Sequence, residues 1–190
     1  MSDGKAPSST VENCPHTLGI KGDISESVRK PNDVVIPLVA EIGFYHLTKT
    51  ALEPALGQLL TKVLGSGKRA VVMASSLERV EALTRGLWTY RTDSFLPHGS
   101  SRDGHADEQP IYLTDKPEAP NGAAVLVLVD NAVAEPMLAG IERVLIMFDG
   151  RDQASLAHAR GSWKAHQEKG EKLVYWQQTE RGGWTKARET

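Results

Sequence analysis

Short apolar runs alternate with amphipathic segments, and this alternation constrains the fold more than any other feature. Three runs are apolar almost throughout, as expected of strands buried on both faces: "RAVVMAS" (69–75), "AAVLVLVDN" (123–131) and "RVLIMFDG" (143–150). Three further segments are strand candidates: 41–47, 111–115 and 172–179. Apolar residues at helical spacing predict three helices: about 50–65, 76–90 and 152–169. The alternation predicts an α/β domain of three layers, with helices on both faces of a mostly parallel sheet.

The length and composition predict one globular domain with an extension. The chain has 190 residues, enough for one domain with a substantial core. Residues 1–38 are rich in Ser, Gly, Pro, Asp and Lys and have no sustained apolar period, so we expect a flexible N-terminal extension before a domain at 39–190. One cysteine, Cys14, allows no internal disulfide, and no apolar run approaches the roughly 18 residues of a membrane span. A secretory signal is also not recognisable, so we expect a cytoplasmic protein without a membrane partner.

The stretch "GSGKR" (65–69) raises the question of a phosphate-binding loop. Such a loop follows a strand and precedes a helix, so that the helix amides and dipole face the phosphate. Here Gly65 and Gly67 instead follow a predicted helix and precede a predicted strand. Lys62 stands where the motif needs its first glycine, and Arg69 stands where it needs Ser or Thr. We interpret the glycines as the end of a helix, and the sequence predicts no nucleotide cofactor.

Catalytic and metal-binding patterns are weak. The histidines lack metal-ligand spacing: His16, His46, His98, His105, His158 and His166. One loop contains four residues that are able to hold a cation, although a solvated polar loop is the favoured interpretation: Asp103, His105, Asp107 and Glu108. Ser100 and Ser101 lie near His98, but no nucleophile elbow frames them. The sequence therefore predicts no catalytic residue and no metal site.

The helix expected at 152–169 has the most informative surface. Arg160 and Lys164 are four residues apart and share a face, and Trp163 lies in the same sector. A basic pair beside a large amphipathic ring suits a ligand with a carboxylate and an aromatic or apolar side chain. In the alternative, Trp163 packs into the core and the two basic residues are solvated charges. The residue types alone favour this alternative.

Seven segments, taken in their order and spacing, resemble the chi subunit of bacterial DNA polymerase III: "EIGFYHLT", "LWTYRTDSFLPHG", "QPIYLTD", "PNGAAVLVLVDN", "RVLIMFDG", "ARGSWKAHQEKG" and "YWQQTERGGW". The likeness extends over about residues 41–186, and its most specific pieces are "LW…SFLPH" and "AR…WKA". The resemblance implies a Rossmann-like fold and a non-catalytic accessory subunit of the replicative holoenzyme. It further implies that the chain links the clamp loader, through the psi subunit, to single-stranded DNA-binding protein during DNA replication, and meets DNA only indirectly.

The resemblance also assigns partner-binding residues. In the chi family, basic side chains meet the carboxylates of the acidic tail of single-stranded DNA-binding protein, and an apolar pocket takes its terminal phenylalanine. Arg160, Trp163 and Lys164 match positions that the family uses for this contact. Trp88 matches a tryptophan position near that site, and Phe95 resembles the residue that the family presents to psi. The pairing is physically reasonable, because a carboxylate suits an Arg fork and a ring suits an apolar wall.

Two positions depart from the family pattern. Leu156 stands where some members carry an additional lysine, and Ser162 replaces a basic residue. The basic surface is therefore thinner here. The resemblance then implies either weaker tail binding or a part of the contact moved to Lys172 or Arg181.

Two other classes of function stay open. The first is a nucleotide-using α/β enzyme, which would bind its ligand at the carboxyl ends of the strands. The second is a module that binds single-stranded DNA directly through exposed tryptophans. Against it, most tryptophans are mainly packing residues, and this applies to Trp88, Trp176 and Trp184 as well.

Overall fold

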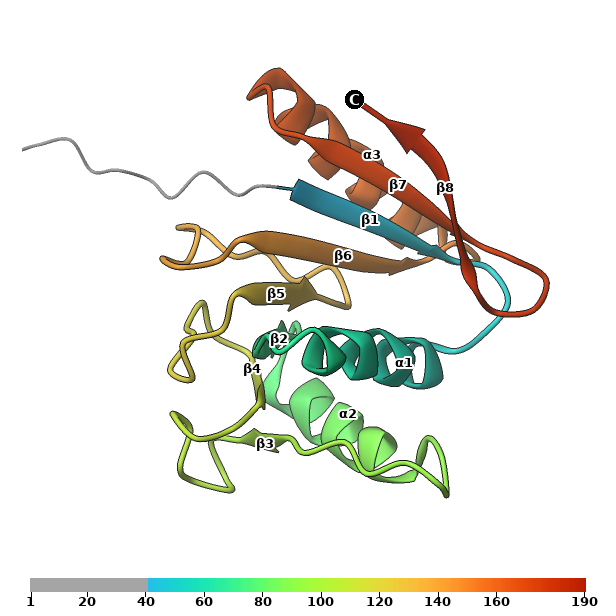
Figure 1. Cartoon of the computed structure of the whole chain (residues 1–190). Helices are drawn as coiled ribbons and strands as arrows, with labels where there is room; N and C mark the ends of the chain where they lie inside the picture. The colour runs from blue at the N-terminus through green and yellow to red at the C-terminus, as the bar shows by residue number, and fades with distance from the viewer. Residues whose placement is uncertain (1–40) are drawn as a thin grey trace, which may run out of the picture. The chain divides into compact units, whose positions relative to one another are not determined.

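A computed structural model describes residues 41–190 as an α/β domain built on one eight-stranded sheet (Figure 1). The strand order is β3-β4-β2-β5-β6-β1-β7-β8, and every neighbouring pair is parallel except β7 and β8. The strands are β1 (Glu41–Leu47), β2 (Ala70–Met73), β3 (Gly99–Ser100), β4 (Ile111–Thr114), β5 (Val125–Leu128), β6 (Arg143–Asp149), β7 (Leu173–Gln178) and β8 (Trp184–Glu189). The predicted α/β fold with a mostly parallel sheet is confirmed. The predicted extension at 1–38 and Cys14 lie outside the described residues.

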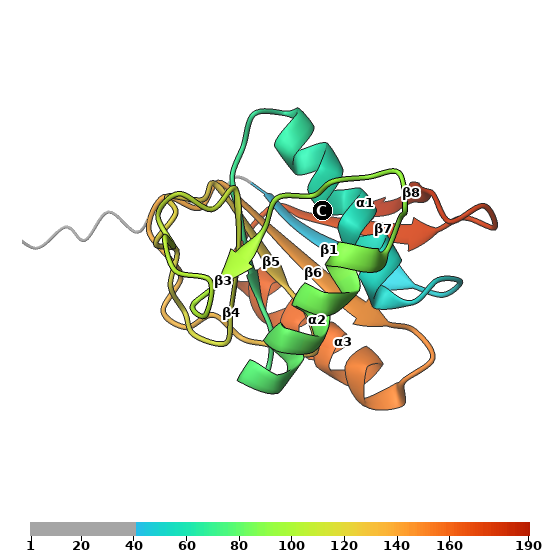
Figure 2. The ribbon, with the colours of Figure 1, turned by 90° about the horizontal axis from the view of Figure 1, so that it is seen from below.

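Three helices cover the two faces of the sheet: α1 (Leu52–Gly65), α2 (Leu77–Thr89) and α3 (Gln153–Glu168). Helices α1 and α2 pack on one face of the sheet and α3 packs on the other. Figure 2 shows α1 and α3 on opposite sides of β1 and β6. Helix α3 connects β6 to β7, and because these two strands flank β1, the connection passes over β1. The three layers predicted from the alternation are therefore present.

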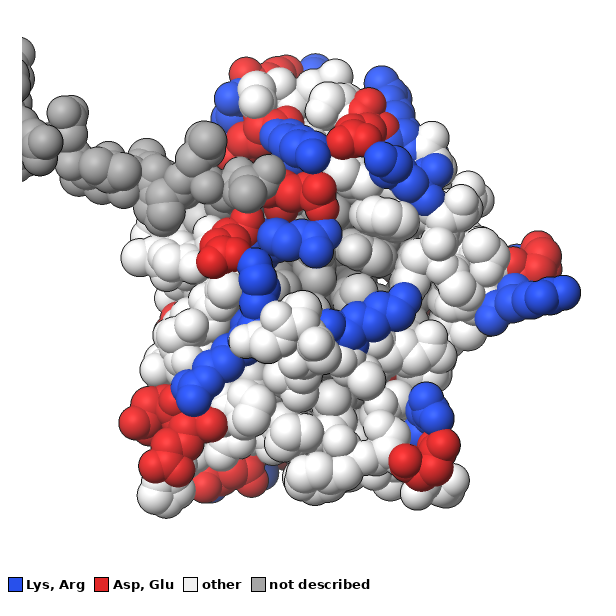
Figure 3. Space-filling view, viewed as in Figure 1, with Lys and Arg blue, Asp and Glu red and all other residues white. Residues whose placement is uncertain are grey.

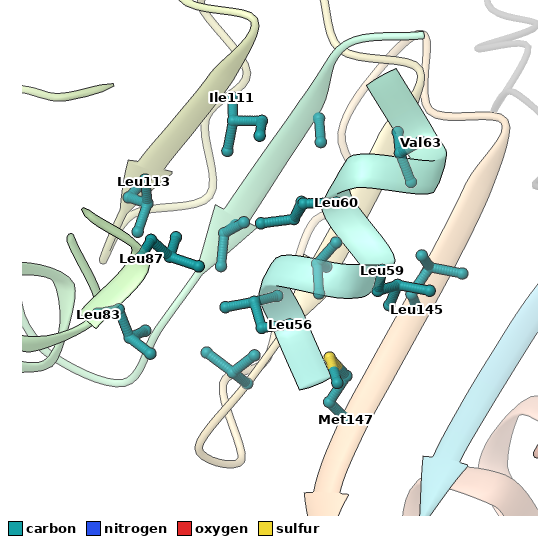
Figure 4. Packing of buried hydrophobic residues seen from close by; sticks show 14 of the residues in the cluster. Leu56, Leu59, Leu60, Val63, Leu83, Leu87, Ile111, Leu113, Leu145 and Met147 are labelled. Atoms are coloured by element: carbon teal, nitrogen blue, oxygen red, sulfur yellow. The ribbon is translucent and has the colours of Figure 1, made fainter. Parts of the chain in front are cut away.

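The larger core lies between the sheet and helices α1 and α2 (Figure 4). Leu56 and Leu60 of α1 and Leu83 of α2 have no exposed surface and pack above the central strands. Burying each such leucine side chain stabilises the fold by roughly 1.5–3 kcal/mol. The regular spacing of these leucines is the signal that made both helices predictable.

Helix α3 packs less deeply than α1. Six residues of α1 are buried, whereas Ser155 and Ala159 are the two buried residues of α3. The remaining turns of α3 present half-buried or exposed side chains beside the sheet. Part of the sheet face therefore remains open next to α3.

The loop 65–69 ends a helix, as predicted. Helix α1 ends at Gly65, and Gly67 has a φ of 75°, a left-handed conformation that glycine adopts without strain. The amide of Gly67 donates to the carbonyl of Leu64. The guanidinium of Arg69 donates to the backbone carbonyls of Asp107 and Asn121. Arg69 therefore fastens two loops together, and the phosphate-loop interpretation has no structural support.

Strands β3 and β8 were not predicted. Strand β3 lies inside 91–110, which reads mostly as loop, and β8 has five exposed residues of six. Strand β8 forms the outer edge of the sheet and pairs antiparallel with β7. An edge strand of this kind lacks the apolar run that reveals a buried strand.

Candidate functional site

Aromatic side chains gather on the sheet beside α3. Phe44 and His46 point to this side from β1, because alternate residues of a strand share a face. His46 is in register with Phe148 of β6, and the two rings stack with centroids 5.1 Å apart. Phe44 is in register with Tyr175 of β7. Trp163 of α3 covers this surface from above, with ring centroids 5.0 Å from Phe44 and 6.0 Å from Tyr175.

These rings form the floor of a groove of about 480 Å³ between α3 and β8, which we call the α3 groove. Its lining is mostly apolar, with a histidine, a tyrosine and two arginines: Phe44, His46, Phe148, Leu156, Ala159, Arg160, Trp163, Tyr175, Ala187 and Arg188. A mostly apolar concave surface with a few placed polar groups is typical of a binding site.

The polar groups of the floor are held in an uncharged state. The Tyr175 hydroxyl and His46 Nδ1 lie 2.8 Å apart and form a hydrogen bond. Burial lowers the pKa of His46, although nearby Asp149 opposes the shift. Burial raises the pKa of the Tyr175 hydroxyl, and the positive charge of Arg160 opposes that shift. At neutral pH the floor is therefore a neutral aromatic surface.

The position of the His46 ring depends on a glycine that follows β6. A Cβ atom added at Gly150 would collide with His46 Nε2. His46 Nε2 is buried and has no hydrogen-bond partner among the described residues. The missing side chain at Gly150 therefore leaves room for the imidazole to lie flat on Phe148.

Arg160 and Lys164 lie on the exposed surface of α3, as the spacing predicted. Lys164 lies 3.9 Å from Glu168, an exposed pair of the kind that contributes little stability. Within residues 41–190, Arg160 has no carboxylate partner and lines the groove. Arg160 is therefore free to meet a carboxylate from outside the domain.

Trp163 lies at the margin of the core and also lines the groove. The ring packs edge-on against Phe44, which is 1% exposed, and so extends the core. The side chain is also half-buried and lines the groove. Core packing of Trp163 is therefore present, and its exposed edge leaves the binding interpretation as a prediction.

Trp88 does not lie with Arg160, Trp163 and Lys164. It belongs to α2, on the opposite face of the sheet, and contacts Phe95 and His98 with ring centroids 5.9 Å and 4.5 Å away. Trp88 is 51% exposed and Phe95 is 77% exposed, and together they form what we call the α2 patch. Figure 3 looks onto this side of the domain and shows a mainly uncharged surface over α2.

The two substitute basic residues suggested by the sequence also lie outside the groove. Lys172 precedes β7 and lies 3.6 Å from Glu41 and 3.3 Å from Glu189. Arg181 lies in the turn between β7 and β8. The second arginine of the groove is instead Arg188 of β8, which sequence reasoning missed. Strand β8 is polar and mostly exposed, so its sequence contains no apolar pattern that would single out Arg188.

The carboxyl ends of the strands form a separate, smaller hollow of about 170 Å³, which we call the strand-end crevice. Arg79 of α2 spans it and forms a two-pronged hydrogen bond with Asp130, at 2.8 Å and 3.3 Å. The side chain of Asp152 accepts hydrogen bonds from the first amides of α3, and Ser76 accepts one from Arg79 of α2. The polar groups at the usual ligand position of this fold are therefore paired with one another.

The other candidate sites are structural. His98 is buried, and its two ring nitrogens face the backbone carbonyls of Leu96 and Thr84. Asp103 accepts hydrogen bonds from the amide and hydroxyl of Ser100, which closes a turn. In residues 41–190, no three His, Cys, Asp or Glu side chains are grouped to hold a metal ion.

Trp176 and Trp184 pack against the core. The rings of Trp176 and Trp184 lie 6.0 Å and 5.0 Å from that of Tyr45 and join the core beneath α1. No helix in the described part of the chain is long and apolar enough to cross a membrane.

Comparison with known proteins identifies the family. The family model described as "DNA polymerase III chi subunit, HolC" matches residues 39–174. A protein of Rickettsia prowazekii (strain Madrid E), named "Probable DNA polymerase III subunit chi", is 34% identical over 94 residues. The aligned part covers 50% of this chain and 57% of that relative, so the chain matches little more than half of the relative's length. Because the family model matches well over half of its residues, the chain belongs to the family of DNA polymerase III chi subunits.

Proposed function

We propose that this chi subunit is a non-catalytic adaptor that binds the acidic tail of single-stranded DNA-binding protein in the α3 groove. Through a second surface it would join that protein to the clamp loader of the replicative polymerase. The observation that carries the proposal is the combination of a neutral aromatic floor with an arginine, Arg160, that no carboxylate in residues 41–190 neutralises. We expect this adaptor to act in the cytoplasm, without a cofactor or a metal.

The chemistry of the groove fits the end of such a tail. A terminal phenylalanine ring would lie among Phe44, Phe148 and Trp163, where edge-on aromatic contacts are favourable. The terminal carboxylate would meet Arg160, whose planar guanidinium suits a two-pronged hydrogen bond. Lys164, one turn further along α3, would add a more exposed and weaker attraction.

The α2 patch suits a different partner. Trp88 and Phe95 are exposed aromatic side chains in contact, and such anchors are typical of protein–protein interfaces. We propose that this patch binds the psi subunit or another component of the clamp loader. Trp88 would then belong to this contact, not to the tail site, because α2 and α3 cover opposite faces of the sheet.

A fluorescence-anisotropy titration tests the tail site. The probe is a labelled acidic peptide that ends in Ile-Pro-Phe, prepared with a free and with an amidated carboxyl terminus. We expect saturable binding that amidation weakens, and a loss of about tenfold or more in affinity for Arg160→Ala. Arg85→Ala is the matched control, because it removes an exposed helical arginine from the opposite face.

The outcomes separate the proposal from its alternatives. Equal binding of the peptide by Arg160→Ala and the unaltered protein would remove Arg160 from the site. Absence of binding at about 100 μM, a weak range for peptide recognition, would overturn the tail-binding proposal. Quenching of tryptophan fluorescence by an unlabelled oligonucleotide, with a steep salt dependence, would instead support direct binding of single-stranded DNA.

The α2 patch has its own test. We expect Phe95→Ala and Trp88→Ala to weaken co-purification with psi or the clamp loader while the acidic peptide binds as before. Unchanged co-purification of both variants would show that the clamp-loader contact lies elsewhere.

A further inference from the structure

Strand β8 contains a bulge that changes the direction of one side chain. Tyr175 is in register with Arg188, and Trp176 is in register with Lys186, so Ala187 is an extra residue on β8. In a regular strand, residues two positions apart point to the same face. The bulge places Arg188 opposite Tyr175, on the α3 side, while Lys186 lies opposite Trp176, on the α1 side. Bulges commonly redirect side chains in this way next to functional sites.

The redirected Arg188 lies over the groove. Its guanidinium carbon is 5.7 Å from the centroid of the Trp163 ring, and Arg188 and Ala187 both line the groove. Lys186 on the other face forms a 2.7 Å ion pair with Glu189. Among residues 41–190, Arg188 has no such carboxylate partner. One basic residue of β8 is therefore neutralised, and the other is left facing an open groove.

The groove has two cations at different places. The charge of Arg160 acts on the Tyr175 hydroxyl, which is hydrogen-bonded to His46 in the floor. Arg188 instead lies over Trp163, on the outermost strand of the sheet. None of the ten described residues that line the groove is acidic, so an acidic peptide would meet attraction from both walls.

We propose that Arg188 is a second cationic contact, which binds side-chain carboxylates of an acidic peptide whose terminal carboxylate is held by Arg160. This inference rests on the proposed function. Stacking on Trp163 limits the conformational freedom of Arg188 before a ligand arrives, so less is lost on binding. Arg188 also supplies from β8 the positive charge that Leu156 and Ser162 do not supply on α3.

Three labelled peptides test which carboxylate Arg188 binds: the acidic peptide with a free terminus, its amidated form, and a form with its Asp and Glu replaced by Asn and Gln. We expect Arg188→Ala to weaken binding of the first two peptides about tenfold, a usual size for loss of a charge-assisted contact. The third peptide should bind Arg188→Ala and the unaltered protein equally. Lys186→Ala is the matched control and should leave all three affinities within about twofold, because its charge lies on the opposite face.

A second variant tests the bulge while the arginine remains. Deletion of Ala187 removes the extra residue and makes Lys186 and Arg188 neighbours that point to opposite faces, so Arg188 stays opposite Tyr175 on the α3 side. We therefore expect this deletion to leave the affinity for the acidic peptide within about twofold of that of the unaltered protein, because the contact depends on the face of Arg188 and not on the extra residue. Thermal unfolding shows whether the deletion variant is folded. If it is not folded, the point substitution Arg188→Ala still tests whether Arg188 contacts the peptide.

The results distinguish this inference from the proposed function. This inference alone is overturned if Arg160→Ala weakens peptide binding while Arg188→Ala binds the peptide as tightly as the unaltered protein does. If the unaltered protein does not bind the acidic peptide, the proposed function falls and this inference falls with it. An Arg188→Ala variant that loses affinity only for the free terminus would show that Arg188 binds the terminal carboxylate, which also overturns the assignment.

Discussion

The α3 groove and the strand-end crevice belong to the same sheet but differ in how their charges are satisfied. In the crevice, Arg79 is paired with Asp130 by two hydrogen bonds and lies 3.8 Å from Glu53. In the groove, Arg160 and Arg188 have no carboxylate partner within residues 41–190. Folds of this class usually bind ligands at the carboxyl ends of their strands. Here internal pairing occupies that position, and the groups left for a partner lie on the face of the sheet.

This difference shows why the fold alone is a poor guide to the site. A crevice binds an anion when helix amides and cations in it are free. The Asp152 and Ser76 side chains already accept from the amides at the N-termini of α3 and α2. The groove, in contrast, exists because α3 buries little of its surface against the sheet and leaves part of the sheet face uncovered. The placement of unsatisfied charge, rather than topology, therefore identifies the candidate site.

Reversing the charge of the groove should have the largest effect. We expect Arg160→Glu to reduce affinity for the free-terminus acidic peptide by about 100-fold or more, because repulsion replaces attraction at the terminal carboxylate. Anisotropy titration measures the loss, and thermal unfolding should show little change, because Arg160 is exposed. Retained affinity would contradict the contrast between groove and crevice.

Removing the cation of the crevice should affect stability instead of binding. We expect Arg79→Ala to destabilise the domain by about 1 kcal/mol, since it leaves Asp130 without its main partner in a partly exposed site. This corresponds to a fall of roughly 2–4 °C in Tm, measured by calorimetry. The acidic peptide should bind the variant unchanged. A clear loss of peptide affinity would mean that the two regions are coupled.

The N-cap of α3 links the crevice to the groove through a helix that borders both, and its contribution should depend on pH. Hydrogen bonds from the Ser155 hydroxyl and from the Ser155 and Ala154 amides hold the pKa of Asp152 below its usual value. A carboxyl with a depressed pKa stabilises the folded state above its unfolded pKa, near 4, and loses that contribution as the pH falls further.

We therefore expect the unfolding free energy of the unaltered protein to exceed that of Asp152→Asn at pH 7, with the difference shrinking toward pH 3. Urea unfolding at both pH values measures it. Asparagine retains the geometry of a cap, so the comparison isolates the charge. A difference that does not change with pH would assign the role of Asp152 to its hydrogen bonds alone.

Nucleotides should have the smallest effect. We expect ATP and NAD to leave the thermal unfolding midpoint unchanged within about 1 °C, because a ligand shifts stability only if it binds the folded state. A concentration-dependent rise in the midpoint would revive the nucleotide-using enzyme and show that the paired charges of the crevice open to a ligand.

The parts predictable from sequence are those with a repeating apolar signal. Val71 and Val72 of β2 and the leucines of α1 revealed a buried strand and a helix because burial imposes their spacing. The periodicity of α2 revealed a helix, but no periodicity states which face of the sheet a helix covers. The resemblance to the chi family grouped Trp88 with Arg160, although α2 and α3 cover opposite faces of the sheet.

Arg188 was unpredictable for a further reason. Strand β8 is exposed at the edge, so its residues are not selected for an apolar pattern. Even a correct prediction of the strand would have placed Arg188 and Lys186 on the same face, because alternation holds only without a bulge. Its direction depends on pairing with β7, a contact between segments that the local sequence does not encode.

The space next to Gly150 has a consequence for how chi sequences of this kind diverge. A Cβ atom at residue 150 and the imidazole of residue 46 compete for the same volume, about a hundred positions apart in the chain. Any larger residue at 150 therefore demands a smaller or redirected side chain at 46, and the groove floor would change shape with it. Positions 46 and 150 should accordingly vary together among relatives, and the pair offers a sequence marker for lineages that keep a flat aromatic floor.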